Sequence, residues 1–205
     1  MCESETLYLP VSLGEAIDKL TILDIKLARI TDSRKIDVQK EHSLLFEKLA
    51  AYITRYHSLY TSMKKVNTII WDYMDALRDG ALDEDAYFKL CKKTIELNDV
   101  RFRIKNKINY AAGSLLKEQK GYKINRVLIA ICASVDASRL IRFIRYYSCL
   151  YDQVVVCGTA MDEFKSDPCI MFVDSVDQNL VFQKKYTITQ NTDFDVEEAM
   201  IDMIL

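Results

Sequence analysis

The stretch that decides the fold runs from Ile36 to Asp79 and reads IDVQKEHSLLFEKLAAYITRYHSLYTSMKKVNTIIWDYMDALRD. It holds no glycine or proline, and one face of it repeats at strictly alternating spacings of four and three. The members of this seam are Val38, His42, Leu45, Leu49, Tyr52, Tyr56, Leu59, Met63, Val66, Ile70, Tyr73 and Leu77. Such a heptad seam predicts one helix of about 58 Å. Because aromatic and polar residues dilute it, we expect its partner helix within the same chain.

That partner follows directly. Gly80 suits the left-handed turn after a helix, and the acidic residues Asp83 to Asp85 favour the start of the next one. A second seam then repeats by three and four from Tyr87 to Leu115. The short link predicts an antiparallel helical hairpin. Gly113, inside the last expected turns, predicts a close contact between helices.

A further helix is expected before the hairpin. Ser12 and Glu15 have the spacing of a capping box, in which each side chain accepts a hydrogen bond from a free amide. An apolar stripe follows at helical spacing, made of Leu13, Ala16, Leu20, Leu23, Leu27 and Ile30. We therefore predict a three-helix, coiled-coil-like module over residues 1–122, in which this first helix packs along the hairpin.

After Gly121 the pattern changes to short continuous apolar runs, which are typical of parallel strands buried on both faces. Strands are predicted at 126–133, 153–157, 169–174 and 185–189, with an amphipathic helix over 138–150 and a terminal helix from Asp195 to Leu205. Residues 123–205 then form a small α/β, half-Rossmann-like domain. The predicted fold class is a two-part α+β chain.

Composition narrows the function classes. Five glycines and two prolines in 205 residues, against roughly 24 expected, argue against sandwiches and disordered chains. The formal charge of -2 argues against a nucleic-acid-coating protein. No apolar run is long enough to span a membrane, and the start of the chain has no signal-peptide pattern, so we expect a soluble cytoplasmic protein. Six scattered cysteines and two histidines predict reduced thiols and no metal site.

One candidate site follows the first strand of the α/β part. Its loop has no glycine, so it lacks the phosphate-binding patterns of dinucleotide and Walker loops, and we expect no cofactor. Three arginines on the next helix instead suit a phosphate or a sugar-phosphate. The anion-binding candidates are Ser134, Asp136, Arg139, Arg142 and Arg145. Helix capping by the loop and a solvated basic face are the alternative interpretations.

A second candidate is a polar junction between helices. Arg101 interrupts the second seam, and its charge needs a partner, which Glu15, Asp18 or Asp24 of the first helix can supply. The residues assigned to this junction are Glu15, Asp18, Lys19, Lys26, Asn98, Asp99, Arg101 and Lys105. Such charges either fix the register between helices or line a polar cleft.

Pro10 to Lys26, Leu97 to Arg101, Lys105, and Gly113 to Glu118 followed by Lys120 to Tyr122 carry a resemblance. The chain resembles an uncharacterised small helical family of bacteria and large DNA viruses, whose members are often encoded beside sugar-transfer genes. That family implies no activity. For a viral member it implies the host cytoplasm.

Residues 127–174 are similar to the opening of the acceptor-side domain in heptosyltransferase-like glycosyltransferases, through the helix-then-strand segment Leu140 to Val156. The glycine-acid loop of that family is replaced here by Ser134 to Asp136. The resemblance implies a non-catalytic accessory or scaffold protein of glycan assembly, which docks a protein partner, a sugar-phosphate or a nucleotide sugar. Two alternatives stay open: a transferase half-domain active only with a partner chain or dimer mate, and a coiled-coil homodimer.

Overall fold

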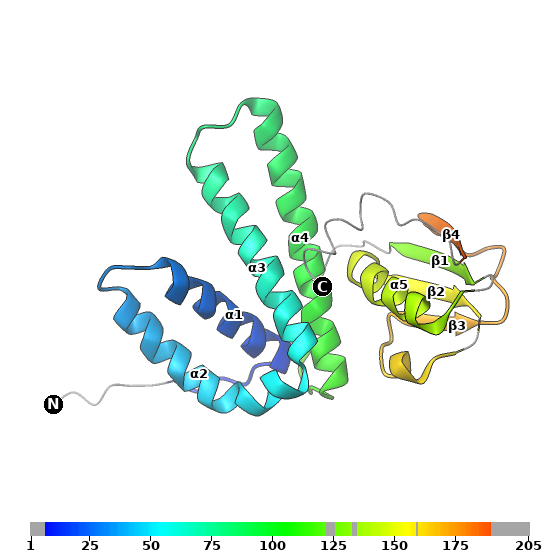
Figure 1. Cartoon of the computed structure of the whole chain (residues 1–205), viewed down its shortest axis with the longest axis horizontal. Helices are drawn as coiled ribbons and strands as arrows, with labels where there is room; N and C mark the ends of the chain where they lie inside the picture. The colour runs from blue at the N-terminus through cyan, green and yellow to red at the C-terminus, as the bar shows by residue number, and fades with distance from the viewer. Residues whose placement is uncertain (1–6, 122–125, 133–134, 159, 190–205) are drawn as a thin grey trace.

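A computed structural model describes residues 7–121, 126–132, 135–158 and 160–189, in which a helical part precedes a mixed α/β part (Figure 1). The helical part contains α1 (Leu13–Arg29), α2 (Lys35–Arg55), α3 (His57–Arg78) and α4 (Glu84–Ala111). The α/β part contains β1 (Val127–Cys132), α5 (Ala137–Leu150), β2 (Gln153–Cys157), the short 3-10 helix η1 (Asp162–Phe164), β3 (Ile170–Val173) and β4 (Lys184–Ile188).

The expected single helix over the first seam is wrong. The chain breaks at Tyr56, whose φ of -113° and ψ of 37° lie outside the helical region, so α2 and α3 are separate helices. The four-three spacing continues across the break and gives no sign of it. At the joint, the Tyr56 hydroxyl donates to the carbonyl of Ala111 at 3.2 Å, which fixes the turn against the end of α4. The helical part therefore has four helices where three were predicted.

The two halves of the seam have different main partners. α2 lies along α1, whereas α3 runs beside α4 in the opposite direction (Figure 1). α1 also contacts α3 and α4, so it is covered on three sides. Its fully buried residue Ile17 shares one core cluster with Met63 and Val66 of α3 and Leu97 of α4. α2 is mostly exposed and buries only Leu49.

The end of α4 corrects the prediction for Gly113. Gly113 has a φ of +62° and no atom within 4 Å of an added Cβ, so it serves backbone geometry and makes no close helix contact. Its amide donates to the carbonyl of Tyr110, and the amide of Ser114 donates to that of Asn109. This is the Schellman pattern that ends helices at a left-handed glycine. The helix accordingly stops at Ala111, earlier than the seam predicted.

The four strands form one parallel sheet in the order β3-β2-β1-β4, which confirms the predicted strands. α5 packs on one face, where Phe143, Ile144 and Tyr147 are buried. On the other face Ile129 and Val155 are covered by Val176 and Leu180 from the segment between β3 and β4. Burial on both faces is the reason the two central strands, β1 and β2, read as continuous apolar runs. The predicted helix at Asp195 to Leu205 lies outside the described residues.

No helix among the described residues is long and apolar enough to cross a membrane. The five described cysteines are free thiols.

Candidate functional site

The polar junction forms around Asp18, which is only 1% exposed at the centre of the helical part. Arg101 of α4 donates to both carboxylate oxygens, at 2.7 and 2.5 Å. Asn67 of α3 donates to the same carboxylate at 2.9 Å and to the hydroxyl of Thr21 at 2.9 Å. The bidentate contact raises the pKa of Arg101. One buried carboxylate thus ties α1 to both helices of the α3–α4 pair.

Lys105 makes a second link one turn along α4. Its ammonium lies 3.0 Å from Glu15 of α1 and also pairs with Glu118, which follows α4. Burial alone would lower the pKa of Lys105, but the two carboxylates outweigh burial and raise it. The predicted capping box is therefore only half formed. Ser12 accepts from the amide of Glu15 at 3.2 Å, while the Glu15 carboxylate turns to Lys105.

Gly14 brings the backbone of α1 close to that of α4. Its amide donates to Oδ1 of Asn109 at 2.7 Å, and an added Cβ would lie 2.4 Å from the carbonyl oxygen of Lys105. The side chain of Asn109 is fully buried. Sequence reasoning expected the close contact at Gly113 and missed Asn67, Asn109 and the role of Gly14.

The remaining residues assigned to the junction lie apart from Asp18. Lys19 pairs with Glu41 of α2 on the surface, at 2.6 Å, and Asn98 donates to the carbonyl of Thr94 within its own helix. Lys26 lies in the last turn of α1, and Asp99 lies on α4. The predicted group therefore divides, and only four of its members, Glu15, Asp18, Arg101 and Lys105, come together.

Asp24 belongs to a separate cluster between the first three helices. It accepts from His42 at 2.8 Å, from Lys64 at 3.0 Å and from the hydroxyl of Tyr60. Burial alone would raise the pKa of Asp24, but these three donors outweigh it and lower that pKa. The contact of His42 with Asp24 hence joins α2 to α1.

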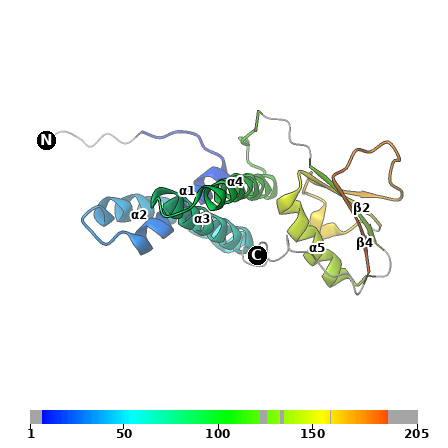
Figure 2. The same ribbon diagram turned by 90° about the horizontal axis from the view of Figure 1, so that it is seen from above.

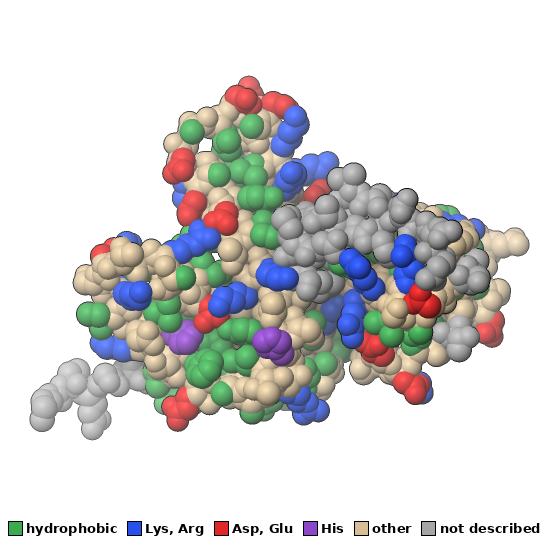
Figure 3. Space-filling model, viewed as in Figure 1, with side chains coloured by type: hydrophobic (Ala, Val, Ile, Leu, Met, Phe, Trp, Pro, Cys, Tyr) green, Lys and Arg blue, Asp and Glu red, His purple; other side chains and the backbone are tan. Residues whose placement is uncertain are grey.

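A hollow lies where the helical part meets α5 and η1. We call it the interface pocket; it has a volume of about 530 Å³, within the range of small-molecule sites. Figure 3 shows Lys and Arg side chains beside acidic ones on this face of the molecule. Its lining residues are Ser58, Leu59, Ser62, Lys107, Tyr110, Ala111, Ser138, Ile141, Arg142, Arg145, Tyr146, Ser148, Cys149, Glu163, Phe164, Ser166 and Asp167.

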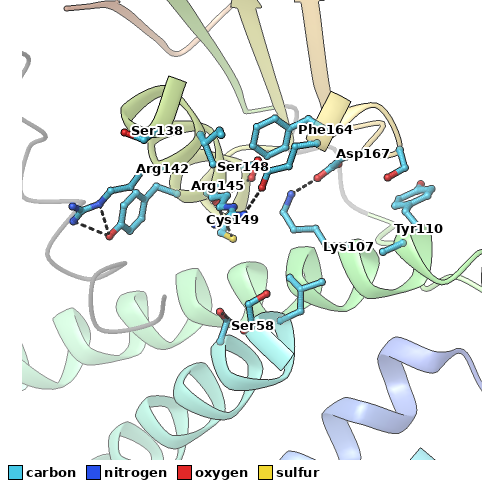
Figure 4. Close-up of a pocket in the computed structure, with 17 residues that line it drawn as sticks. Ser58, Lys107, Tyr110, Ser138, Arg142, Arg145, Ser148, Cys149, Phe164 and Asp167 are labelled. Carbon is cyan, nitrogen blue, oxygen red and sulfur yellow. Dashed lines mark hydrogen bonds and ion pairs between the residues drawn. The ribbon is translucent and has the colours of Figure 1, made fainter. Parts of the chain in front are cut away.

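The charged residues of the interface pocket come from both parts of the chain. Lys107 of α4 pairs with Asp167 at 2.5 Å, and Arg145 of α5 pairs with Glu163 (Figure 4). Arg142 donates to the hydroxyl of Tyr146 at 3.2 Å and lies 5.3 Å from the centre of its ring. Three basic and two acidic side chains leave this lining with a formal charge of +1.

The predicted anion-binding residues are only partly gathered here. Arg142 and Arg145 line the interface pocket, whereas Arg139 is not part of the lining. Asp136 caps α5, since it accepts from the amide of Arg139 at 2.8 Å. Ser134 lies outside the described residues. Sequence reasoning missed Lys107 and the serines of α3, because it considered the loop and α5 alone.

Two ion pairs hold the helical part against the α/β part beside the pocket. Arg103 lies 2.9 Å from Asp152 and also donates to the carbonyl of Cys149 at the end of α5. Lys107, one turn further along α4, makes the pair with Asp167. The side chains of Arg103 and Lys107 are both nearly buried. Arg103 lies at the C-terminus of α5, where the helix dipole stabilises a cation. One face of α4 thereby fixes the pocket geometry.

The thiol of Cys149 is a poor nucleophile. Burial raises its pKa, so the neutral thiol predominates at neutral pH. Among the described residues, no group of three or more His, Cys, Asp and Glu side chains is placed to hold a metal ion. The lining offers charged and hydroxyl groups to a ligand.

The family assignment comes from residues 7–136, which match the model of a family of unknown function, DUF6165. The chain belongs to this DUF6165 family. The matched region holds all four helices of the helical part and continues through β1 to Asp136, the cap of α5. The family region thus includes the first strand of the sheet. No curated protein and no solved structure matches the chain.

Proposed function

We propose that this member of DUF6165 is a non-catalytic accessory protein of glycan assembly that binds a sugar-phosphate in the interface pocket. The observation that carries the proposal is the joint lining by basic and hydroxyl side chains from both parts of the chain. Arginine guanidinium groups bind phosphate through charge-assisted hydrogen bonds. The pocket offers two of them, Arg142 and Arg145.

Serine hydroxyl groups in the pocket would bind the sugar part of the ligand. Five serines line the pocket, and they come from α3, α5 and the segment after η1: Ser58, Ser62, Ser138, Ser148 and Ser166. A serine hydroxyl can both donate and accept, which matches the hydroxyls of a sugar. The phosphate would contact the arginines, and the sugar ring would contact the serines.

The homodimer alternative is less well supported by the packing. Leu49, Met63 and Val66 of the first seam are buried within the chain, so these three are not open to a second copy, although Tyr52 of the seam is exposed. The helical part remains available for protein contacts through its exposed apolar residues, for example Leu44 and Phe88. A transferase activity completed by a partner chain is the second candidate, and the same ligand test bears on it.

We expect the full chain to bind glucose 1-phosphate and not glucose in isothermal titration calorimetry. Arg142→Gln should weaken glucose 1-phosphate binding about tenfold, the value of one charge-assisted hydrogen bond. Lys165→Gln is the matched control, since Lys165 is next to the lining residues Phe164 and Ser166 but pairs with Asp162 on the surface. Its affinity should stay within about twofold of the parent.

Equal affinity for glucose and glucose 1-phosphate would contradict the proposal, because the phosphate would then contribute nothing. An Arg142→Gln variant that binds as tightly as the parent would show that Arg142 does not contact the phosphate, contrary to the proposal. Release of free sugar or phosphate during the titration would instead favour the catalytic alternative.

A further inference from the structure

The interface pocket has more apolar lining than a simple sugar-phosphate can use. Leu59 of α3, Ala111 of α4, Ile141 of α5 and Phe164 of η1 face the same hollow as the arginines and serines. Water in contact with these side chains is displaced favourably only by an apolar group of the ligand. The apolar side chains of the lining therefore have no matching group in a simple sugar-phosphate.

Aromatic rings lie along the same hollow. Tyr110 and Tyr146 line it from α4 and α5, and the guanidinium of Arg142 lies 5.3 Å from the Tyr146 ring centre. Figure 4 shows Arg142 towards one end of the pocket, and Lys107 with Tyr110 towards the other. Flat ligand groups stack on aromatic rings and on guanidinium planes. The pocket hence combines anion-binding groups with surfaces that suit a flat ring.

The volume fits such a composite ligand. About 530 Å³ lies well inside the range of sites that enclose drug-sized molecules, in which a few polar groups orient a mostly apolar contact. A phosphate bound near Arg142 and Arg145 leaves the space between Leu59 and Phe164 for a second, uncharged group. The polar groups would orient the ligand, and the apolar group would add affinity.

From this arrangement we infer that the preferred ligand of the interface pocket is a nucleoside phosphate, a sugar-phosphate that carries a flat base. The inference rests on the proposed function, since it places the phosphate at the same arginines. It adds a base between the apolar side chains of α3, α5 and η1. No bond is made or broken in this binding step.

Two probes that differ only in the base test the inference: adenosine 5′-monophosphate and ribose 5-phosphate, each titrated calorimetrically into the full chain. We expect the nucleotide to bind at least about tenfold more tightly, as stacking of one base provides. Ile141→Thr and Leu59→Ser, at half-buried positions on two different helices, should each reduce that advantage and leave the affinity for ribose 5-phosphate unchanged. Circular dichroism of both variants checks that they fold.

The outcomes separate the two proposals. Equal affinity for both probes would overturn the inference and leave sugar-phosphate binding standing. Failure of both probes and of glucose 1-phosphate to bind would overturn both. A nucleotide advantage that survives in both folded variants would place the base elsewhere and overturn the inference as well.

Discussion

Asp18→Ala should destabilise the chain by about 3 to 5 kcal/mol, the usual cost of removing one partner from a buried ion pair. The substitution leaves Arg101, whose side chain is 25% exposed, without its bidentate carboxylate, and it removes the acceptor of the Asn67 amide. All three helices tied to Asp18 lose a contact at once. The free energy of unfolding, from urea titration followed by circular dichroism, measures this effect.

A surface ion pair provides the control. Glu41→Ala breaks the pair with Lys19, in which both side chains are about half exposed, and should cost less than about 1 kcal/mol. Arg101→Ala should cost much less in the Asp18→Ala background than in the parent, because the two groups act as one unit. Additive losses from the two substitutions would show that Asp18 and Arg101 contribute independently, contrary to the structure.

Gly14→Ala should cost about 2 to 4 kcal/mol. The new Cβ would lie 2.4 Å from the carbonyl oxygen of Lys105 and 2.9 Å from Oδ1 of Asn109, so α1 must move away from α4. Overpacking of this kind costs about 1 to 3 kcal/mol, and losing the hydrogen bond from Gly14 to Asn109 adds about 1 kcal/mol. Because a backbone atom makes the closest contact, a side-chain rotation cannot relieve it.

Gly121→Ala is the matched control for this prediction. An added Cβ at Gly121 has no atom within 4 Å, so the variant should unfold within about 0.5 kcal/mol of the parent. The comparison uses the same urea titration. If Gly14→Ala is as stable as Gly121→Ala, the close approach of α1 and α4 is not present in solution.

Element types were predictable from the sequence because each depends on a local pattern. The continuous apolar runs predicted parallel strands, and the amphipathic segment predicted a helix; the structure has strands and α5 at these places. The break at Tyr56 was not predictable in this way. The seam keeps its spacing across the joint, and what bends the chain is tertiary: α2 packs on α1, while α3 packs on α4.

The two glycines show the same limit. Gly14 lies inside α1, and Gly113 lies just after the end of α4, so both have helical neighbours in the sequence. The sequence alone therefore does not distinguish a glycine that adopts a positive φ from one that allows a close contact. Only the geometry shows that Gly113 ends α4 and that Gly14 meets Lys105.

The sequence predicted the arginines of the candidate site but not the residues that other helices contribute to it. Arg142 and Arg145 follow from their spacing on α5, but Lys107 and Ser58 are far away in the sequence. They join the arginines because Arg103 and Lys107 of α4 pair with Asp152 and Asp167. Such long-range pairs leave no periodic trace. In the helical part, the charge of Arg101 did indicate a partner on α1, and Asp18 supplies it.

A nuclear magnetic resonance titration of the nitrogen-15-labelled full chain with glucose 1-phosphate tests most directly whether a ligand site lies between the two parts of the chain. We expect amide shifts at Ser58 to Ser62 of α3 and at Ser138 to Cys149 of α5, saturating at the same ligand concentration, because both segments line one pocket. Shifts confined to one of these segments, shifts only near Cys157 and Asp174 at the carboxyl edge of the sheet, or no shifts would contradict a shared phosphate site.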